Sequence, residues 1–322
     1  RRFTDAETLY QQVLEIEPEQ PTAIHMLGLL AHQTGQHNLA IELIGRALEL
    51  EPELAEAHNN LGIVRQTLGN LQEAEASCRT AISIRPTYAE AHYNLGNVLQ
   101  ELGELDDAVT NYQKALSLDL EYTPAYHNLG IIYYQQGLLQ EAEEYYRRAQ
   151  RSGSGDYSAE LCNNFGAVLH SLGSFDEALL QIRQALATKP NYPEALVNLS
   201  TVLHDTSKST DAQKTQTSVQ NPLVEAELCL RKALDLKHDF AEAHYNLGNI
   251  LQAVGQLEES VDSYCNALRL QPDYGQAWHN LRGVAKALSF LRAEQTPYTT
   301  IKTIPLTPET RSSISFAMLD YY

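Results

Sequence analysis

Apolar and small residues recur along this chain at a helical spacing, and the whole pattern repeats. A pair of the type Leu-Gly, or a close variant of it, begins at Leu27, Leu61, Leu95, Leu129, Phe165, Leu199, Leu247 and Leu281. Successive pairs lie 34, 34, 34, 36, 34, 48 and 34 residues apart. A period of this length is typical of arrays of short helical units, in which each unit buries its apolar face against its neighbours.

Alanines form two further series with the same period. The first series is Ala40, Ala74, Ala108, Ala142, Ala178 and Ala226, and the second is Ala47, Ala81, Ala115, Ala149, Ala185, Ala233 and Ala267. Members of the two series in one unit are seven residues apart, which places them on the same face of a helix. Small side chains on that face let neighbouring helices approach closely.

Glycines and prolines recur at the ends of the helical patterns. Gly35, Gly69, Gly103, Gly137, Gly173 and Gly255 fall between two helical patterns, and Pro18, Pro52, Pro86, Pro190 and Pro272 follow the second pattern. Glycine tolerates the positive φ that ends a helix, and proline cannot continue the helical hydrogen bonds. Each unit is therefore predicted to be a helix-turn-helix hairpin, and the fold class to be all-α.

The spacing of Leu95-Gly96, Leu99, Gly103, Ala108, Tyr112 and Ala115 resembles the tetratricopeptide repeat (TPR). The resemblance implies a right-handed superhelical solenoid, with the first helix of every repeat lining its concave side. The predicted array covers residues 1–293. It has a half-repeat at 4–17, full repeats at 21–54, 55–88, 89–122, 123–158, 159–192, 193–240 and 241–274, and a cap helix at 275–292.

Two stretches depart from the repeat. The sixth repeat carries an inserted polar segment, which predicts a surface loop at about 205–220. Residues 294–322 break the pattern with three prolines, at Pro297, Pro305 and Pro308, yet they end in an apolar sequence. We expect this segment to be a C-terminal tail or the stub of a following domain.

Composition narrows the possible partners. The chain has 41 acidic and 23 basic residues and a net charge of −18, which disfavours nucleic acid and anionic lipid. It contains no apolar run of the roughly 18 residues that a membrane span needs. The four cysteines, Cys78, Cys162, Cys229 and Cys265, are widely spaced and form no CxxC pair. We interpret them as reduced thiols, which predicts no metal site and a cytoplasmic location.

A row of asparagines is the main candidate site. The sixth position of successive repeats, and of the cap helix, is occupied by Asn60, Asn94, Asn128, Asn164, Asn198, Asn246 and Asn280. An asparagine side chain both accepts and donates, so a row of them suits the backbone of an extended polypeptide. Asparagines at this position can instead bond to the neighbouring helix. The row resembles that of the repeat region of O-linked N-acetylglucosamine transferases, where asparagines hold the substrate chain.

Further positions of the predicted groove supply polar and aromatic side chains. The candidate peptide-binding residues besides the asparagine row are Tyr93, Asn97, Gln100, His127, Tyr134, Tyr245 and Asn249. Glutamates at the second position, Glu56, Glu90, Glu160, Glu194 and Glu242, add negative charge. The partner is therefore expected to be a protein or peptide that is extended and neutral or basic.

No motif for catalysis, phosphate binding or a dinucleotide occurs in the chain, so neither a catalytic residue nor a cofactor is predicted. The leading hypothesis is a protein-interaction scaffold that binds a polypeptide in its concave groove. The alternative is the substrate-recruiting arm of a larger enzyme, such as a protein O-glycosyltransferase, whose catalytic domain lies beyond Tyr322. Self-association of the array is a third class, and the oligomeric state is left open with a monomer favoured.

Overall fold

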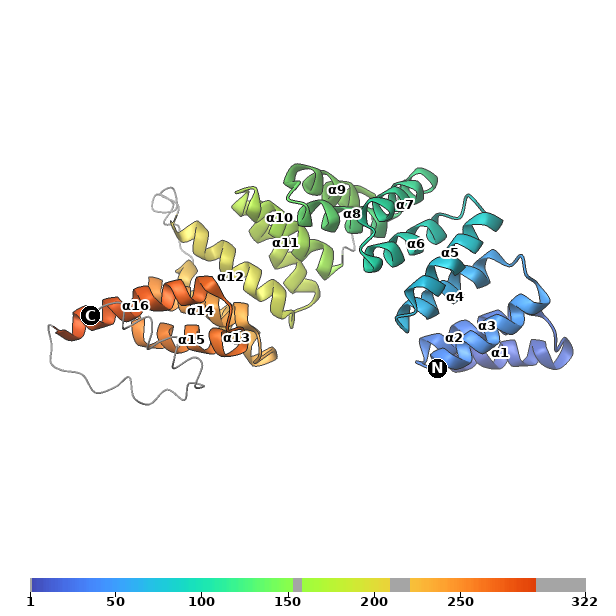
Figure 1. Cartoon of the computed structure of the whole chain (residues 1–322), viewed down its shortest axis with the longest axis horizontal. Helices are drawn as coiled ribbons and strands as arrows, with labels where there is room; N and C mark the ends of the chain where they lie inside the picture. The colour runs from blue at the N-terminus through green and yellow to red at the C-terminus, as the bar shows by residue number, and fades with distance from the viewer. Residues whose placement is uncertain (1, 153–157, 209–220, 294–322) are drawn as a thin grey trace. The chain divides into compact units, whose positions relative to one another are not determined.

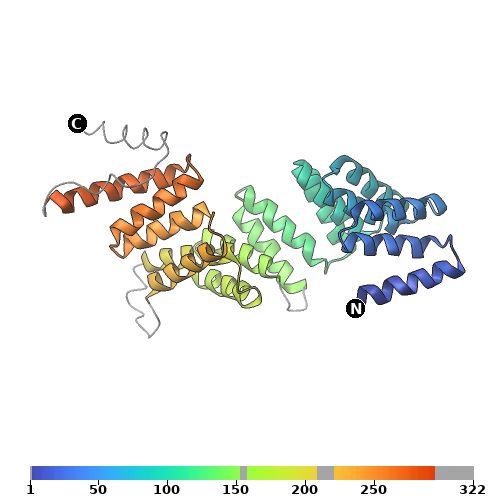
Figure 2. The ribbon, with the colours of Figure 1, turned by 90° about the horizontal axis from the view of Figure 1, so that it is seen from below.

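The computed structural model describes residues 2–152, 158–208 and 221–293. These residues form sixteen α-helices and no strand, so the predicted all-α class is confirmed. The helices belong to two units, one spanning Arg1–Tyr157 and the other Ser158–Tyr322. Figures 1 and 2 show that each unit is built from helical hairpins.

The first unit holds nine of the helices found in the described residues. They are α1 (Arg2–Ile16), α2 (Pro21–Gln33), α3 (His37–Leu50), α4 (Ala55–Thr67), α5 (Leu71–Ile84), α6 (Ala89–Leu102), α7 (Leu105–Leu118), α8 (Thr123–Gln135) and α9 (Leu139–Ser152). The helices α2, α4, α6 and α8 each begin at the residue where the sequence pattern starts a repeat. Each of them packs against the helix that follows it.

The second unit repeats this arrangement. Its helices are α10 (Ala159–Ser171), α11 (Phe175–Thr188), α12 (Pro193–Lys208), α13 (Pro222–Leu236), α14 (Ala241–Ala253), α15 (Leu257–Leu270) and α16 (Gly275–Ala293). The helices α10, α12 and α14 are the first helices of their hairpins, and α16 follows the last hairpin where a cap helix was expected. Along the series, α10 contacts α12, α12 contacts α14, and α14 contacts α16.

The first helices of successive repeats carry a shared surface in each unit. In the first unit α4 contacts both α2 and α6, and hydrogen bonds join α6 to α8. We use the name first-helix face for the surface carried by α2, α4, α6 and α8 in the first unit. The same name covers the surface carried by α10, α12, α14 and α16 in the second.

The alanine series lie at buried contacts between helices. The Ala40 carbonyl faces Gly28 of α2 within its own hairpin, whereas Ala267 packs with Ala277 and Leu281 of α16, the helix that follows its hairpin. Every alanine of both series is fully buried, with 0% of its surface exposed. In the seventh repeat, Ser260 takes the place of the first alanine and is also fully buried. The side chain of Ser260 donates to the Leu257 carbonyl oxygen at 2.8 Å, so its hydroxyl is satisfied within its own helix.

The hairpin turns use the predicted glycines. All six have positive φ, between 76° and 84°, so this expectation is confirmed. At Gly103 the backbone N–H donates to the Gln100 carbonyl at 3.1 Å, and the next N–H, of Glu104, donates to the Leu99 carbonyl at 2.9 Å. These bonds satisfy carbonyls that the end of α6 would otherwise leave without partners.

In every hairpin whose following residue lies in the described part of the chain, the second helix ends at a residue with extended backbone. Arg85, which follows α5 and precedes a proline, has φ −130° and ψ 89°. A residue before proline is held away from helical ψ, so the helix ends there. Asp119 precedes Leu120 instead of proline, yet it has nearly the same conformation, φ −139° and ψ 103°. The repeat geometry therefore fixes this backbone position without the proline.

The predicted loop of the sixth repeat begins later than expected. Helix α12 continues to Lys208, so residues 205–208 are helical rather than part of the loop. Asp205 accepts hydrogen bonds from His170 of α10 at 3.0 Å and from Lys208 at 3.1 Å, and these contacts hold the extra turn. The rest of the predicted loop, 209–220, and the predicted tail, 294–322, lie outside the described residues.

Candidate functional site

Six of the seven asparagines of the predicted row join neighbouring repeats through hydrogen bonds. Three of them donate through Nδ2 to the fifth position of the preceding repeat: Asn60 to His25 Nε2 at 2.8 Å, Asn94 to Asn59 Oδ1 at 2.9 Å, and Asn198 to Asn163 Oδ1 at 2.9 Å. Three others donate to the ninth position of the preceding repeat: Asn128 to Asn97 Oδ1 at 2.8 Å, Asn280 to Asn249 Oδ1 at 2.8 Å, and Asn246 to Thr201 Oγ1 at 3.3 Å. Each of these six amides donates a hydrogen bond within the protein and accepts none of these bonds, so its Oδ1 can accept from a ligand.

A tyrosine from the second helix anchors the network of the third repeat. The hydroxyl of Tyr112 on α7 lies 2.8 Å from both Asn97 Oδ1 and Gln100 Oε1, between which it shares its proton. The same hydroxyl accepts from Asn128 Nδ2 at 3.2 Å. Burial raises the pKa of Tyr112, with the hydrogen bond from Asn128 opposing the rise. The hydroxyl therefore stays protonated and acts as a donor at neutral pH.

The seventh repeat, in the second unit, contains the same network. The Tyr264 hydroxyl lies 2.8 Å from Asn249 Oδ1 and 2.9 Å from Gln252 Oε1. Asn280 of α16 donates to Asn249 at 2.8 Å and to the Tyr245 hydroxyl at 3.3 Å. Burial raises the pKa of Tyr264 to about 12. Each unit therefore carries one copy of this arrangement.

The network orients the amides of Asn97 and Gln100. Because their side-chain oxygens accept from Tyr112, their –NH2 groups are turned away from it. Among the described residues no acceptor is bonded to Asn97 Nδ2 or Gln100 Nε2, and both side chains are partly exposed. The first-helix face thus presents donors from the ninth and twelfth positions of the repeat beside acceptors from the sixth.

The candidate residues Tyr93 and Tyr245 of this face pack against other tyrosines. The Tyr93 ring packs between the rings of Tyr112, at 5.7 Å, and Tyr122, at 5.1 Å. Tyr245 packs in the same way against Tyr264 and Tyr274 in the second unit.

The other candidates lie apart from these two networks. The His127 ring is 5.8 Å from that of Tyr146, and 36% of the surface of Tyr134 is exposed. Asn164 Oδ1 accepts from the side chain of its neighbour Asn163 at 3.4 Å.

Sequence reasoning missed two sets of residues at this face. Tyr112 and Tyr264 were not predicted as site residues, although an asparagine at the ninth position and a glutamine at the twelfth accompany both of them. A second set is the tyrosine at the last position of several repeats: Tyr88, Tyr122, Tyr192 and Tyr274. The signal for the second set is an aromatic residue that directly precedes the first helix of the next repeat.

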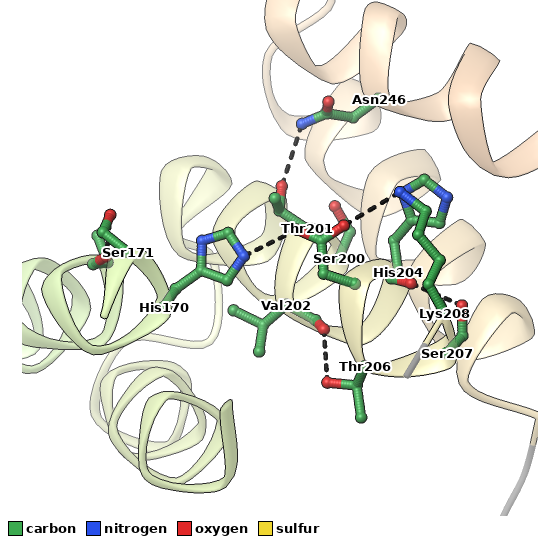
Figure 3. Close-up of polar contacts among 12 residues, drawn as sticks. His170, Ser171, Ser200, Thr201, Val202, His204, Thr206, Ser207, Lys208 and Asn246 are labelled. Carbon is green, nitrogen blue, oxygen red and sulfur yellow. Dashed lines mark hydrogen bonds and ion pairs between the residues drawn. The ribbon is translucent and has the colours of Figure 1, made fainter. Parts of the chain in front are cut away.

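In the second unit the residue at position twelve of the fifth repeat, His170, also links two first helices, α10 and α12. Figure 3 shows His170 of α10 pointing toward α12, and Asn246 of α14 pointing toward Thr201. His170 Nε2 lies 3.0 Å from Asp205 Oδ2, and Lys208 binds the other carboxylate oxygen. Burial of Asp205 opposes its ionisation, but the hydrogen bonds from His170 and Lys208 outweigh burial and lower its pKa.

Three histidines each contact a backbone carbonyl of a nearby turn. His58, His92 and His244 each place Nε2 within 3.2 Å of a backbone carbonyl oxygen of the turn six residues earlier. No group of three or more His, Cys, Asp or Glu side chains in the described residues is arranged to hold a metal ion. Among the described helices, none is both long enough and apolar enough to cross a membrane.

The buried His25 predicts a pH dependence of stability. Burial lowers its pKa from the ordinary value of 6.5, and the Glu56 carboxylate only partly offsets this. The unfolded chain therefore takes up a proton first, so this contribution is present above pH 6.5 and declines as the pH falls toward the folded pKa. The loss is at most about 1.4 kcal/mol per pH unit for one group. Thermal unfolding midpoints between pH 7.5 and pH 5 should fall less steeply in H25Q.

The matched control for this prediction is H238Q, because His238 is exposed. Wild type and H238Q should show the same slope of unfolding midpoint against pH. A slope in H25Q equal to that of the wild type would show that His25 is not the group responsible.

Two models of the tetratricopeptide repeat match this chain. One matches residues 53–121, 87–152 and 122–191, and the other matches residues 21–54 and 241–274. Together the matches cover more than half of the chain. The chain is also similar in structure to the crystal structure of the APC/C hetero-tetramer Cut9-Hcn1, with a TM-score of 0.65 and 19% identity, over 88% of this chain and 52% of that one. This likeness supports the solenoid fold alone.

Two curated proteins are similar in sequence over part of their length. Protein O-mannosyl-transferase TMTC1 of Homo sapiens is 28% identical over 152 residues, which is 40% of this chain and 17% of the relative. Tetratricopeptide repeat protein 17 of Danio rerio is 33% identical over 131 residues, which is 38% of this chain and 10% of the relative. The chain thus spans less than a fifth of the length of either relative.

Proposed function

The chain belongs to the tetratricopeptide repeat family, and from this premise we propose that its first-helix face binds an extended polypeptide. In this proposal the chain is a protein-interaction scaffold that performs no chemistry of its own. The observation that carries the proposal is the orientation of the amides on this face. The internal bonds use the nitrogen of Asn128 and the oxygens of Asn97 and Gln100, so the oxygen of Asn128 and the nitrogens of Asn97 and Gln100 are left for a ligand.

This arrangement suits a main chain rather than a particular side chain. An extended polypeptide offers alternating C=O and N–H groups. The Asn128 oxygen can accept from such an N–H, while the Asn97 and Gln100 amides can donate to a C=O. The duplicate set at Asn249 and Asn280 gives the second unit the same capacity. Binding through main-chain contacts permits many sequences, which is what a scaffold requires.

The charge of the face supports a neutral or basic ligand. Exposed glutamates stand at the second position of several first helices, and the chain as a whole carries a net charge of −18. An acidic polypeptide would be repelled, whereas a basic one would be attracted over about a Debye length. We therefore propose an extended protein segment of neutral or positive charge as the partner.

N97D tests the outward donor with little change to the packing. The aspartate keeps an oxygen that accepts from Tyr112 and Asn128, so the inner network stays intact, but the outward –NH2 is lost. One or two hydrogen bonds of about 0.5–1.5 kcal/mol each are worth roughly a 3- to 100-fold change in affinity. We expect peptides selected on the wild type from a displayed random library to lose at least about threefold in affinity for N97D. Fluorescence anisotropy measures this, and circular dichroism checks the fold.

Q12E is the charge control, because Gln12 is exposed on α1 and the substitution adds the same charge away from Asn97. Affinity for Q12E should equal that of the wild type, and N249D should repeat the effect of N97D for peptides bound to the second unit. If N97D folds normally and binds every selected peptide as the wild type does, main-chain recognition at this position is wrong.

A second candidate function is the substrate-recruiting arm of a larger glycosyltransferase. The similarity to a protein O-mannosyl-transferase supports it, whereas the finer likeness to the arm of O-linked N-acetylglucosamine transferases stays a hypothesis. Sequencing the transcript beyond the codon of Tyr322 tests this candidate. A catalytic domain in the same reading frame would support it, and a stop codon directly after Tyr322 would overturn the predicted downstream domain.

A further inference from the structure

Three repeats contain the same contact between a glutamate, a cation and an aromatic ring. In the second repeat Arg85 pairs with Glu56 at 2.5 Å, and its guanidinium carbon lies 4.9 Å from the centre of the Tyr88 ring. In the fifth repeat Lys189 pairs with Glu160 at 3.2 Å and lies 4.3 Å from the Tyr192 ring. The cation is thus held between a carboxylate and the face of an aromatic ring.

The sixth repeat contains the third instance. Lys237 pairs with Glu194 at 3.4 Å and lies 4.4 Å from the Phe240 ring. In each instance the glutamate is the second residue of a first helix, and the cation is the extended residue that ends the second helix. The aromatic residue follows three positions after the cation.

The third and seventh repeats keep the glutamate and the tyrosine but lack the cation. The third repeat has Glu90 and Tyr122 with Asp119 at the cation position. The seventh repeat has Glu242 and Tyr274, and Gln271 takes the cation position. Within the described part of the chain, neither Glu90 nor Glu242 forms an ion pair with a lysine, arginine or histidine.

The backbone at these two positions matches that of the occupied repeats. Asp119 has φ −139° and ψ 103°, and Gln271 has φ −135° and ψ 91°. Arg85, Lys189 and Lys237 have φ between −130° and −144° and ψ between 85° and 90°. The sites therefore share the backbone conformation and differ in the side chain, which is a cation in three repeats and Asp119 or Gln271 in the other two.

The local charge favours a cation at both places. Burial and then the Glu90 carboxylate raise the pKa of Tyr122. Burial and then Glu242 raise the pKa of Tyr274 to about 12. Asp119 also raises the pKa of Tyr122, so it adds negative charge where the other repeats place a positive one.

We propose that Glu90 with Tyr122, and Glu242 with Tyr274, are seats for arginine or lysine side chains of the bound polypeptide. Tyr122 and Tyr274 pack against Tyr93 and Tyr245 of the first-helix face, with ring centres 5.1 Å and 4.9 Å apart. The inference rests on the proposed function, which it deepens by naming the side chains that the ligand must carry. Each unit provides one seat.

The proposal is tested by substitutions that place an arginine or lysine of the chain itself in each seat. D119R and Q271K place a cation on the same backbone conformation as Arg85 and Lys189, where it should occupy the seat and exclude the ligand's cation. A displayed random peptide library is panned against the wild type, each single variant and the double variant. We expect arginine and lysine to be enriched on the wild type, each seat contributing about a two- to fivefold preference, as a partly exposed ion pair would.

The controls add the same charge away from the seats. E49R and Q12K change exposed residues of α3 and α1, and thermal unfolding checks that every variant folds. The preference for basic residues should fall in D119R and Q271K, vanish in the double variant and persist in both controls. Neutral peptides should still bind the double variant.

The two proposals fail in different ways. Peptides that bind the wild type without enrichment in arginine or lysine, or with an enrichment unchanged in the double variant, would overturn the seats and leave polypeptide binding in place. A library from which no peptide is enriched on the wild type would overturn the proposed function and the seats with it.

Discussion

Replacing Tyr112 by alanine is expected to lower the free energy of unfolding of the first unit by about 3–5 kcal/mol. The side chain is fully buried between α6 and α7, and truncation removes its ring contacts and leaves a cavity beside Gly96. It also removes the hydroxyl that holds Asn97 and Gln100. Chemical denaturation followed by circular dichroism measures the loss.

The phenylalanine variant separates the ring from the hydroxyl. Y112F keeps the packing and loses hydrogen bonds to three amide side chains, so we expect a smaller loss of about 1–2 kcal/mol. Because Asn97 and Gln100 lose the group that orients them, peptide affinity should fall together with stability. Y112F as costly as Y112A would show that the hydroxyl network, and not the ring, carries the stability.

The twin residue of the second unit provides the matched test. Tyr264 has the same partners at the same distances, within about 0.1 Å. Y264F should therefore cost as much as Y112F, and the two losses should add in the double variant because the residues share no partner. A double variant that loses much more or much less than the sum would mean that the two networks are energetically coupled.

The fold followed from the sequence because its determinants are local and periodic. Gly103 ends α6 through its own φ, and the alanine at each contact is small enough for the helices to meet. The same glycine and alanine positions recur in almost every repeat, so the structure inferred for one repeat applies to the whole array. The end of α12 was misplaced because its last turn depends on a contact from His170, which lies 35 residues away.

The candidate site was predictable as a set of positions but not as a set of atoms. The sequence places Asn128 and Asn97 on first helices, yet it does not say which end of an amide points outward. That choice depends on the Tyr112 hydroxyl, which belongs to the other helix of the hairpin. The tyrosine reaches the network because a glycine faces it across the hairpin. Sequence periodicity identifies that glycine without revealing the hydroxyl beyond it.

The close approach of Gly96 to the Tyr112 ring also predicts the second large effect on stability, that of G96A. A Cβ at Gly96 would lie 2.6 Å from Cε1 and 2.7 Å from Cδ1 of Tyr112. The ring is buried and its hydroxyl is held by hydrogen bonds, so it has no free direction in which to move. G96A is expected to lower the free energy of unfolding by about 1–3 kcal/mol, although alanine is by itself the better helix former.

Gly45 on α3 offers the matched control for this prediction. Apart from the adjacent backbone of α3 itself, no heavy atom of the described residues lies within 4 Å of a Cβ built there. G45A should therefore raise the free energy of unfolding by about 1 kcal/mol through helix propensity alone. The same chemical change is thus expected to act with opposite sign at two helical glycines of one unit. Denaturation midpoints of the two variants test this directly. A stabilised G96A would mean that α6 and α7 can separate without cost, and the tight hairpin packing described above would then be wrong.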